Sequence, residues 1–418
     1  AEPADDPRLD REAKRFAQQL GELKGGYVKT GQLLALLGEH LLPKPLTRAL
    51  QELESQTQPV PWNEMKSVFR ASLGAAYLDL EIQQEALAAA SLAQVHRARI
   101  VATGQEVVVK GQYPDLAKWI EEDFNAVVRM LRLARWIPAS QDFDSWITKL
   151  HEQLLSEVDY RREQQMALTM ANALESHRGL LPSSVRLRIP KFWHEYCDSQ
   201  ILTMDYVKGY RAATPEVASL PQATRNQLGK AMLQLFFIEV FEVGVIQTDP
   251  NLGNYLISED GRELTLLDFG SVISLDEEVR QALCDTIIFG LQNNDVCLEE
   301  ALVRLGYLSS DAGNRARETF IAFIKSLLEP LRPPEELPSI FLNAHGDYCW
   351  GRCGLLNRAG HQVAKSLSNH QFALPKGDFA MVARKLTGVF TFMAILNSEF
   401  NGYEIAEPYL HNVVPINE

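Results

Sequence analysis

The sequence predicts an α+β protein with two lobes, preceded by a helical extension. Helical periodicity dominates residues 1–77, short strand patterns cluster within residues 78–203, and residues 204–418 are again mostly helical in pattern. At 418 residues the chain is long enough to bury two hydrophobic cores. We therefore expect an N-terminal helical extension, a strand-containing N-lobe with an inserted helix, and a larger C-lobe that is mostly helical.

Helices are expected where apolar residues recur every three to four positions. The predicted helices before the C-lobe are Arg8–Leu42, Pro45–Ser55, Asn63–Ser72, Pro114–Trp136 and Asp142–Ser176.

The two most apolar windows of the chain lie in the predicted C-lobe. They are Ala231–Ile246, which contains Glu239, and Leu386–Asn397, which follows Lys385 directly. Neither window offers the run of about twenty apolar residues that a membrane span needs. Both windows therefore predict buried core helices.

Strands are expected where β-branched and aromatic residues are bounded by turn residues. Ala102-Thr103-Gly104 supplies one such turn. The predicted strands are Asp79–Gln83, Ala93–Ile100, Glu106–Gly111, Pro190–Tyr196, Gln200–Tyr206, Tyr255–Ile257 and Leu264–Leu267.

The composition is that of an ordinary folded protein, with 46% hydrophobic and 23% charged residues. The net charge of −13 argues against a nucleic-acid-binding protein, because such surfaces are usually basic. The five cysteines are an odd number in a long chain, which indicates reduced thiols in a cytosol-like compartment. We expect a cytoplasmic or mitochondrial-matrix-like location, no transmembrane segment in this chain, and peripheral contact with a membrane.

The most informative pattern is an ordered set of an aspartate, an asparagine and a second aspartate. Asp249 precedes Asn254 by five positions, and Asn254 precedes the aspartate of Asp268-Phe269-Gly270 by fourteen. In kinase folds this set surrounds a nucleoside triphosphate. Asp268 is expected to ligate Mg²⁺, Asn254 to hold a second metal ion, and Asp249 to accept a proton or orient a nucleophile.

Lys110 ends the strand pattern Val107-Val108-Val109-Lys110. Kinases carry at this position a lysine that holds the α- and β-phosphates and pairs with a helix glutamate. An exposed strand-end lysine is the alternative, since lysine is commonly exposed. The position of Lys110 before Asp249 and Asp268 favours the phosphate role.

The glutamate that pairs with Lys110 has two candidates, Glu157 and Glu163, in one charged run. If the run is helical, Asp159 and Glu163 repel each other as i, i+4 neighbours and need more than one cation. A solvated charged face is the alternative. Helix geometry alone leaves the choice of glutamate open.

A second cation is available from Lys29-Thr30-Gly31-Gln32 in the extension. On a helix Lys29 and Gln32 point the same way, and the nearby glycines cost about 1 kcal/mol each, which suggests close approach to another surface. The alternative is a loosely packed helix with a surface lysine.

A short alanine-rich stretch takes the place of the glycine-rich phosphate loop of kinases but contains no glycine. Alanines still let backbone N–H groups approach phosphates, with less freedom at positive φ. His96, at its end, is expected to be a strand residue and no catalyst. The predicted phosphate contacts are Ala88, Ala89, Ala90 and Ser91.

Together these features predict a two-lobed protein-kinase-like fold with a nucleotide between the lobes. The sequence resembles the UbiB/ADCK family of atypical, protein-kinase-like proteins linked to coenzyme Q biosynthesis, from about Gly21 to about Asn397. The resemblance rests on ordered motifs: Lys29-Thr30-Gly31-Gln32, the alanine-rich loop, Val107-Val108-Val109-Lys110, Glu157-Val158-Asp159, Gln247-Thr248-Asp249-Pro250-Asn251 and Asp268-Phe269-Gly270.

The resemblance implies a role for each motif. Lys110 is expected to pair with Glu163, Asp249 to be the proton acceptor, and Asn254 with Asp268 to bind Mg²⁺. Regulatory contacts across a substrate cleft are implied for Lys29 and Gln32 near Glu157 and Asp159. The hinge touching the adenine of ATP or ADP would be Met204, Asp205, Tyr206 and Val207.

Two parts that a protein kinase needs are missing from the sequence. Thr248 stands where an arginine is expected before Asp249, and no Ala-Pro-Glu follows Asp268. The resemblance therefore implies an Mg²⁺-dependent ATPase that supports ubiquinone biosynthesis by acting on or presenting lipid intermediates, with other coenzyme Q biosynthesis proteins as partners. The alternatives are a kinase for a prenylphenol-type small molecule and a nucleotide-sensing pseudokinase scaffold.

One further group of residues carries metal-binding side chains. His345, Asp347, Cys349 and Cys353 are close in sequence, but their spacing matches no standard zinc pattern. Ordinary loop or core roles are favoured for them.

Overall fold

The computed structural model describes residues 60–89, 92–116, 158–249, 251–308, 313–355 and 377–410, together with Thr148, His151, Leu155 and Arg358. The chain divides into two units. The first takes in the chain up to Gln165 and Pro190–Tyr206, and the second takes in Met166–Ile189 and the chain from Val207. The predicted helices before residue 60, and most of Pro114–Trp136, lie outside the described residues, so the three-part division at residues 77 and 203 stays a prediction.

The first unit is built on an antiparallel sheet with the strand order β1-β2-β3-β5. Val107, Val108 and Val109 are buried in β3, as expected for a β-branched run in a central strand. The turn between β2 and β3 contains Gly104 at φ +72°, a left-handed conformation that glycine adopts without strain. The strands are β1 Leu80–Ala89, β2 Ala93–Ile100, β3 Glu106–Gln112 and β5 Ile201–Asp205.

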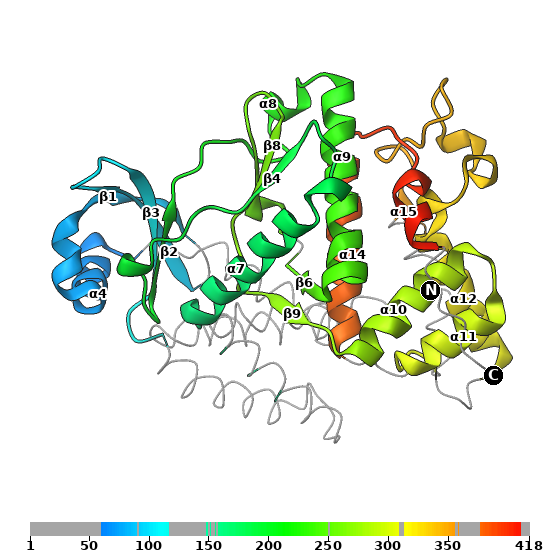
Figure 1. The fold of residues 1–418 in the computed structure, drawn as a ribbon, viewed down its shortest axis with the longest axis horizontal. Helices are drawn as coiled ribbons and strands as arrows, with labels where there is room; N and C mark the ends of the chain where they lie inside the picture. The colour runs from blue at the N-terminus through cyan, green and yellow to red at the C-terminus, as the bar shows by residue number, and fades with distance from the viewer. Residues whose placement is uncertain are drawn as a thin grey trace, which may run out of the picture. The chain divides into compact units, whose positions relative to one another are not determined.

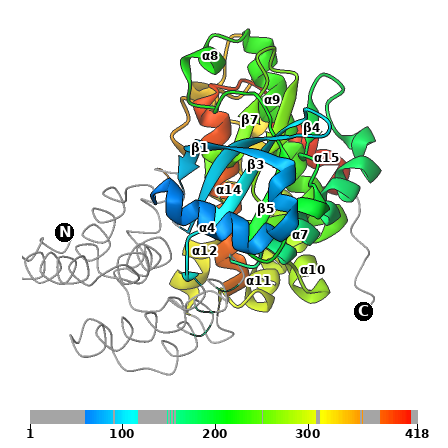
Figure 2. The same cartoon turned by 90° about the vertical axis from the view of Figure 1, so that its left-hand side faces the viewer.

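Helix α4, Trp62–Leu73, packs against this sheet and buries Met65 and Phe69 in the core of the unit. Figure 2 shows α4 lying across the sheet. Gly111 of β3 makes the close packing possible, because a Cβ at this position would overlap the Phe69 ring and lie 3.1 Å from Cε of Met65.

His96 is fully buried in β2, beside the Trp62 and Phe69 rings at centroid distances of 5.2 and 5.5 Å. Its Nδ1 lies 2.8 Å from the carbonyl oxygen of Gln83. Burial lowers the pKa of His96 and outweighs the raising effect of its backbone hydrogen bonds. His96 is thus a core residue of a strand, as predicted.

The second unit is mostly helical. Figure 1 shows α9, Gln222–Phe237, and α14, Gly377–Ile395, running side by side. The predicted core window Leu386–Asn397 lies almost wholly in α14. The helix α9 continues into a π-helical turn, η4 Ile238–Val243, which ends at Gly244 with φ 68°. The predicted window Ala231–Ile246 starts in α9 and runs on through η4 into β6, Val245–Gln247; nine residues of α9 are buried. The described residues of this unit also form α8 Pro215–Ala218, α10 Glu277–Leu291, α11 Asp295–Arg304, α12 Asn314–Leu327 and α15 Tyr403–Leu410.

Two small sheets accompany these helices. One has the order β4-β8-β7, with β4 Arg186–Arg188 parallel to β8 Glu263–Leu266 and β7 Tyr255–Ile257 antiparallel to it. The other pairs β6 Val245–Gln247 with β9 Val272–Ser274 in antiparallel register. The predicted strands at β7 and β8 are confirmed, whereas β4, β6 and β9 are three-residue strands that the sequence pattern did not indicate.

Two predictions about the elements of the first unit were wrong. The strand predicted to end at Gln83 continues to Ala89, because β1 and β2 pair as far as Ala89 opposite Gln94. The stretch Pro190–Tyr196 forms no strand: it contributes a single bridge from Phe192 to Met204, followed by a short 3₁₀ turn.

The predicted helix Asp142–Ser176 is also not continuous. Its last part is α7, Tyr160–Ser176, which starts in the first unit and ends in the second. Asp159 lies just before this helix, and its Oδ1 accepts hydrogen bonds from the backbone N–H groups of Arg161 and Arg162, at 3.1 and 3.2 Å. Asp159 therefore caps α7, and its expected repulsion with Glu163 inside one helix does not arise.

Within the described ranges, the structure contains no helix that is both long enough and apolar enough to cross a membrane.

We predict that Gly111→Ala destabilises the protein by about 1–3 kcal/mol, because the added methyl group overpacks the contact with Phe69. Urea unfolding of both variants measures the change. Gly179→Ala is the matched control, since a Cβ at Gly179 would meet no atom within 4 Å. Equal stabilities of the two variants would contradict the packing argument.

Candidate functional site

Lys110 and Glu163 form an ion pair within the first unit. The ammonium of Lys110 donates to both carboxylate oxygens of Glu163, each at 3.0 Å. The side chain of Glu163 is 1% exposed and that of Lys110 is 15% exposed. The structure thus contains the pairing between Lys110 and Glu163 that the family resemblance implied, whereas the other candidate, Glu157, lies outside the described residues.

The start of α7 places Glu163 in reach of Lys110. Tyr160 and Glu163 are i, i+3 neighbours in the first turn, so both face Lys110, whose Nζ lies 5.0 Å from the Tyr160 ring centroid. The positive end of the helix dipole also favours a carboxylate at this position. The side chain of Gln112, two residues after Lys110, donates to the carbonyl oxygen of Val158 and fixes the chain just before the helix.

The predicted hinge residues follow the same sheet. Met204 and Asp205 end β5 and pair with Val108 and Val107 of β3. Asp205 accepts a hydrogen bond from Nε1 of Trp193 at 3.0 Å. The guanidinium of Arg97 lies 4.2 Å from the ring centroid of Tyr206. The next hinge residue, Val207, belongs to the second unit.

The alanine-rich loop is only partly described. Ala88 and Ala89 are strand residues that pair with Val95 and Gln94, after an irregularity in the register of β1. Ala90 and Ser91 lie outside the described residues, as do Lys29, Gln32 and Glu157, so the roles predicted for these five residues stay predictions.

The Asp249 and Asp268 loops lie at one end of the β6–β9 pair in the second unit. Gln247, the last residue of β6, pairs with Val272, the first residue of β9, so the chain leaving β6 runs beside the chain entering β9. Both the backbone N–H and the hydroxyl of Thr248 donate to the carbonyl oxygen of Ser271, at 2.9 and 2.8 Å. The side chain of Gln247 donates to the carbonyl oxygen of Asp268 at 2.6 Å.

Hydrogen bonds orient the carboxylate of Asp249 from two sides. Its Oδ2 accepts from Nδ2 of Asn254 at 2.5 Å, and its Oδ1 accepts from the backbone N–H of Asn251 at 3.1 Å. Asn251 in turn caps the 3₁₀ turn Leu252–Asn254 through a 2.9 Å bond from the N–H of Gly253. This short turn therefore brings Asn254 back to Asp249 across the five-residue spacing seen in the sequence.

Asp268 is connected to the same turn through its neighbours. The N–H of Leu267 donates to the carbonyl oxygen of Asn254 at 2.9 Å, and Oδ1 of Asp268 accepts from the N–H of Gly270 at 2.9 Å. Phe269 is fully buried and anchors the loop. The second unit thus brings Asp249, Asn254 and Asp268 together.

Carboxylate and amide oxygens are the ligands that Mg²⁺ prefers. Since Nδ2 of Asn254 donates to Asp249, the amide oxygen of Asn254 is turned away from that carboxylate. This oxygen and the carboxylate of Asp268 are chemically suited to Mg²⁺, which usually completes its shell with phosphate oxygens and water.

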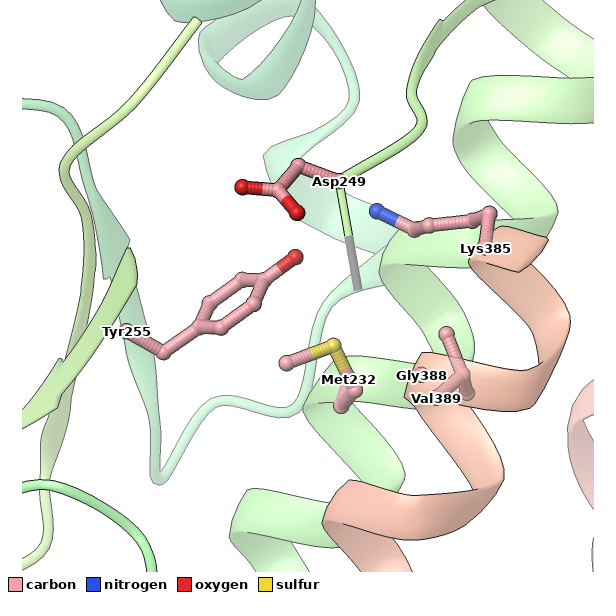
Figure 3. Close-up of a pocket in the computed structure, with 6 residues that line it drawn as sticks. All are labelled: Met232, Asp249, Tyr255, Lys385, Gly388 and Val389. Carbon is pink, nitrogen blue, oxygen red and sulfur yellow. The ribbon is translucent and has the colours of Figure 1, made fainter. Parts of the chain in front are cut away.

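A small cavity beside Asp249 contains residues that the sequence reasoning missed. Asp249, Tyr255 and Lys385 line it together with Met232, Gly388 and Val389. Figure 3 shows the carboxylate of Asp249, the hydroxyl of Tyr255 and the ammonium of Lys385 pointing toward one another. The available signal was a lysine at the start of the apolar window Leu386–Asn397.

Burial raises the pKa of Tyr255, so its hydroxyl stays protonated and donates to Oε1 of Gln247 at 2.7 Å. Burial is the largest single influence on the pKa of Lys385 and would lower it, but the charge of Glu239 together with hydrogen bonds to Glu239 and Tyr255 outweighs burial and raises that pKa. Lys385 is therefore a buried cation.

Among the described residues, no cluster of three or more histidine, cysteine or acidic side chains is placed to hold a metal ion. Sγ of Cys349 accepts from Arg352 at 2.8 Å, and Sγ of Cys353 donates to the carbonyl oxygen of Trp350 at 3.1 Å. Both cysteines are buried in the second unit, in line with the loop or core roles favoured for them.

A strand lysine paired with a helix glutamate in one unit, and an Asp-Asn-Asp set in the other, define a protein-kinase-like protein. The chain belongs to the ABC1 atypical kinase-like domain family, whose model matches residues 52–302. This confirms the UbiB/ADCK resemblance, and with it the α+β protein-kinase-like fold.

Two yeast relatives and one solved structure resemble the chain over nearly its whole length. The chain is 26% identical to the mitochondrial atypical kinase COQ8 of Schizosaccharomyces pombe, covering 95% of the chain and 62% of the relative. It is 27% identical to the mitochondrial atypical kinase COQ8 of Saccharomyces cerevisiae, covering 93% and 73%. The Rv3197 protein of Mycobacterium tuberculosis, solved in a complex with erythromycin, superposes with a TM-score of 0.62 at 21% identity and 96% coverage of both chains.

We predict that Lys110→Met destabilises the first unit by about 3 kcal/mol, because it removes a cation that pairs with the buried carboxylate of Glu163. Adding Glu163→Leu should recover most of this loss, since both charges are then removed. Urea unfolding measures both variants, with Lys208→Met at an exposed lysine as the control. A double variant no more stable than Lys110→Met would contradict the pairing argument.

Proposed function

We propose that the protein is an Mg²⁺-dependent, ATP-binding atypical kinase with ATPase activity that supports ubiquinone biosynthesis. The observation that carries the proposal is the hydrogen-bonded set of Asp249, Asn254 and the Asp268 loop at one end of the β6–β9 pair. This set supplies oxygen ligands for a metal ion beside a carboxylate that can accept a proton.

In this proposal Lys110 holds the α- and β-phosphates and Glu163 fixes its side chain, as the ion pair supports. The alanine-rich loop, from Ala88 to Ser91, lies over the phosphates, and residues Met204 to Val207 contact the adenine. Asn254 and Asp268 hold Mg²⁺, which neutralises the phosphate charge when bound.

The role of Asp249 is to orient the attacking hydroxyl or water and to accept its proton. The bonds from Asn254 and Asn251 hold its carboxylate in one orientation, which such a role requires. With Thr248 in place of an arginine and no Ala-Pro-Glu segment, water or a small molecule is the expected acceptor of the phosphoryl group.

The relatives support the biological side of the proposal. Two of them carry the name atypical kinase COQ8, mitochondrial. We infer from this a mitochondrial-type location, lipid or prenylphenol-type intermediates as small-molecule partners, and other coenzyme Q biosynthesis proteins as macromolecular partners. Lys29 and Gln32 would regulate access from the extension, near Glu157 and Asp159.

Two conservative variants test separately whether Asp268 binds the metal ion and whether Asp249 accepts the proton. Asp268→Asn should abolish the increase in ATP affinity that Mg²⁺ produces in the wild type. Asp249→Asn should bind Mg²⁺-ATP normally and hydrolyse it about 100-fold or more slowly. Calorimetric titration with and without Mg²⁺ and a phosphate-release assay measure these effects.

Glu259→Gln is the matched control for both, since it removes one exposed carboxylate of the same unit outside the site. Equal ATP binding by the wild type with and without Mg²⁺ would refute the metal role. Full rescue by Asp249→Asn of cells that lack the protein would favour a pseudokinase scaffold.

The acceptor of the phosphoryl group is tested by incubating the protein with Mg²⁺-ATP and a prenylphenol. We expect inorganic phosphate to be released and the phenol to remain unmodified, as followed by mass spectrometry. A phosphorylated phenol formed by the wild type and not by Asp249→Asn would instead establish a small-molecule kinase.

A further inference from the structure

Two charged residues are completely buried in the second unit and have no role in the proposal above. Lys385 of α14 is 1% exposed and Glu239 of η4 is fully buried. Nζ of Lys385 lies 3.1 Å from Oε1 and 2.8 Å from Oε2 of Glu239. Such a pair adds little net stability, because desolvation of both charges offsets most of their attraction. Stability alone therefore does not explain it.

The pair is connected to both loops of the site through Gln247. The backbone N–H of Gln247 approaches Oε1 of Glu239 at 3.5 Å. The side chain of Gln247 accepts from the hydroxyl of Tyr255 and donates to the carbonyl oxygen of Asp268, at 2.7 and 2.6 Å. One buried carboxylate is thus linked to the chain two residues before Asp249 and, through it, to Asp268.

Lys385 is also close to two residues of the site, Tyr255 and Asp249. Its ammonium contacts the Tyr255 hydroxyl, and the carboxylate of Asp249 lies across the same small cavity (Figure 3). A cation on the buried side of Asp249 attracts this carboxylate and opposes rotation of the loop that carries it.

The backbone around Glu239 is itself unusual. Glu239 lies in the π-helical turn that follows α9, and such turns are frequent at functional sites. The turn places the carboxylate of Glu239 beside β6, where it pairs with the ammonium of Lys385 and lies near the backbone N–H of Gln247.

We propose that Lys385, paired with Glu239, is a positioning residue that fixes the Asp249 loop. The helix that carries it, α14, lies outside residues 52–302, the segment matched by the family model, so a helix that follows this segment completes the site. The kinetic consequence rests on the proposed ATPase function, whereas the ordering of the loop does not depend on it.

The test compares three proteins with the wild type. Lys385→Met removes the cation, and Lys385→Met with Glu239→Leu replaces the pair by apolar side chains. Arg304→Met is the control, because it breaks the ion pair of Arg304 with the buried Asp285 in the same unit. The measurements are Tm, the kcat and KM of ATP hydrolysis, and amide hydrogen exchange over residues 245–256.

We expect the double variant to melt within about 5 °C of the wild type, because both charges are removed together. Its kcat should fall about 10–100-fold while KM for ATP changes less than about threefold, since the loop is misplaced and the nucleotide contacts remain. Exchange over residues 247–251 should become at least about tenfold faster in it, as local opening becomes easier. Arg304→Met should lower Tm and leave kcat and this exchange unchanged.

A folded double variant with wild-type kcat and wild-type exchange would overturn the proposal. Should the double variant not fold, Lys385→Gln with Glu239→Gln, which removes both charges and keeps polar side chains, is judged by the same criteria. If the wild type hydrolyses ATP no faster than Asp249→Asn, the proposed ATPase activity is refuted. The amide exchange rates over residues 247–251 then decide on their own whether Lys385 positions the Asp249 loop.

Discussion

The candidate site of the second unit depends on the antiparallel pairing of β6 with β9. Each strand has only three residues, and the register sets Gln247 opposite Val272. This register brings Asp249 and Asp268 to the same end of the pair, although they are far apart in sequence. Because a shift by one residue would reverse the side on which each side chain lies, the register has to be fixed by other contacts. Gln247 and Thr248 supply these contacts through Asp268 and Ser271.

In the first unit, Lys110 and Glu163 are also far apart in sequence, and backbone contacts bring them together. Lys110 is fixed in a central strand, and its partner lies on a helix whose start determines where Glu163 points. Asp159 caps that helix, and Gln112 holds the residue before the cap. The ion pair therefore depends on three polar contacts of the backbone as much as on the attraction between its two charges.

The sequence predicted those features that short spacings encode. The five-residue interval from Asp249 to Asn254 is bridged by one turn, and the valine run before Lys110 packs as a central strand should. The resemblance then chose Glu163, where helix periodicity could not. The same reasoning was wrong where pairing with a neighbouring strand decides: β1 is extended to Ala89 by its pairing with β2.

The residues around the cavity could not be predicted for a related reason. Glu239 and Lys385 were each visible as a charge in or beside an apolar window, but nothing local joins residues that are 146 positions apart. Only the packing of α14 against α9 shows that each buried charge is the partner of the other. A lysine and a glutamate are each unfavourable in a core position by themselves. Each can be buried here because the other provides the opposite charge.

The separation of these two residues along the chain has a consequence for the order in which the protein is made. During synthesis Glu239 is added to the chain 146 residues before Lys385. Until Lys385 has been added, the carboxylate of Glu239 lacks the ammonium that it pairs with in the folded unit. During that interval the π-helical turn must either stay hydrated or hold a protonated glutamate. The second unit therefore reaches its final form only after α14 has been synthesised and has packed against α9.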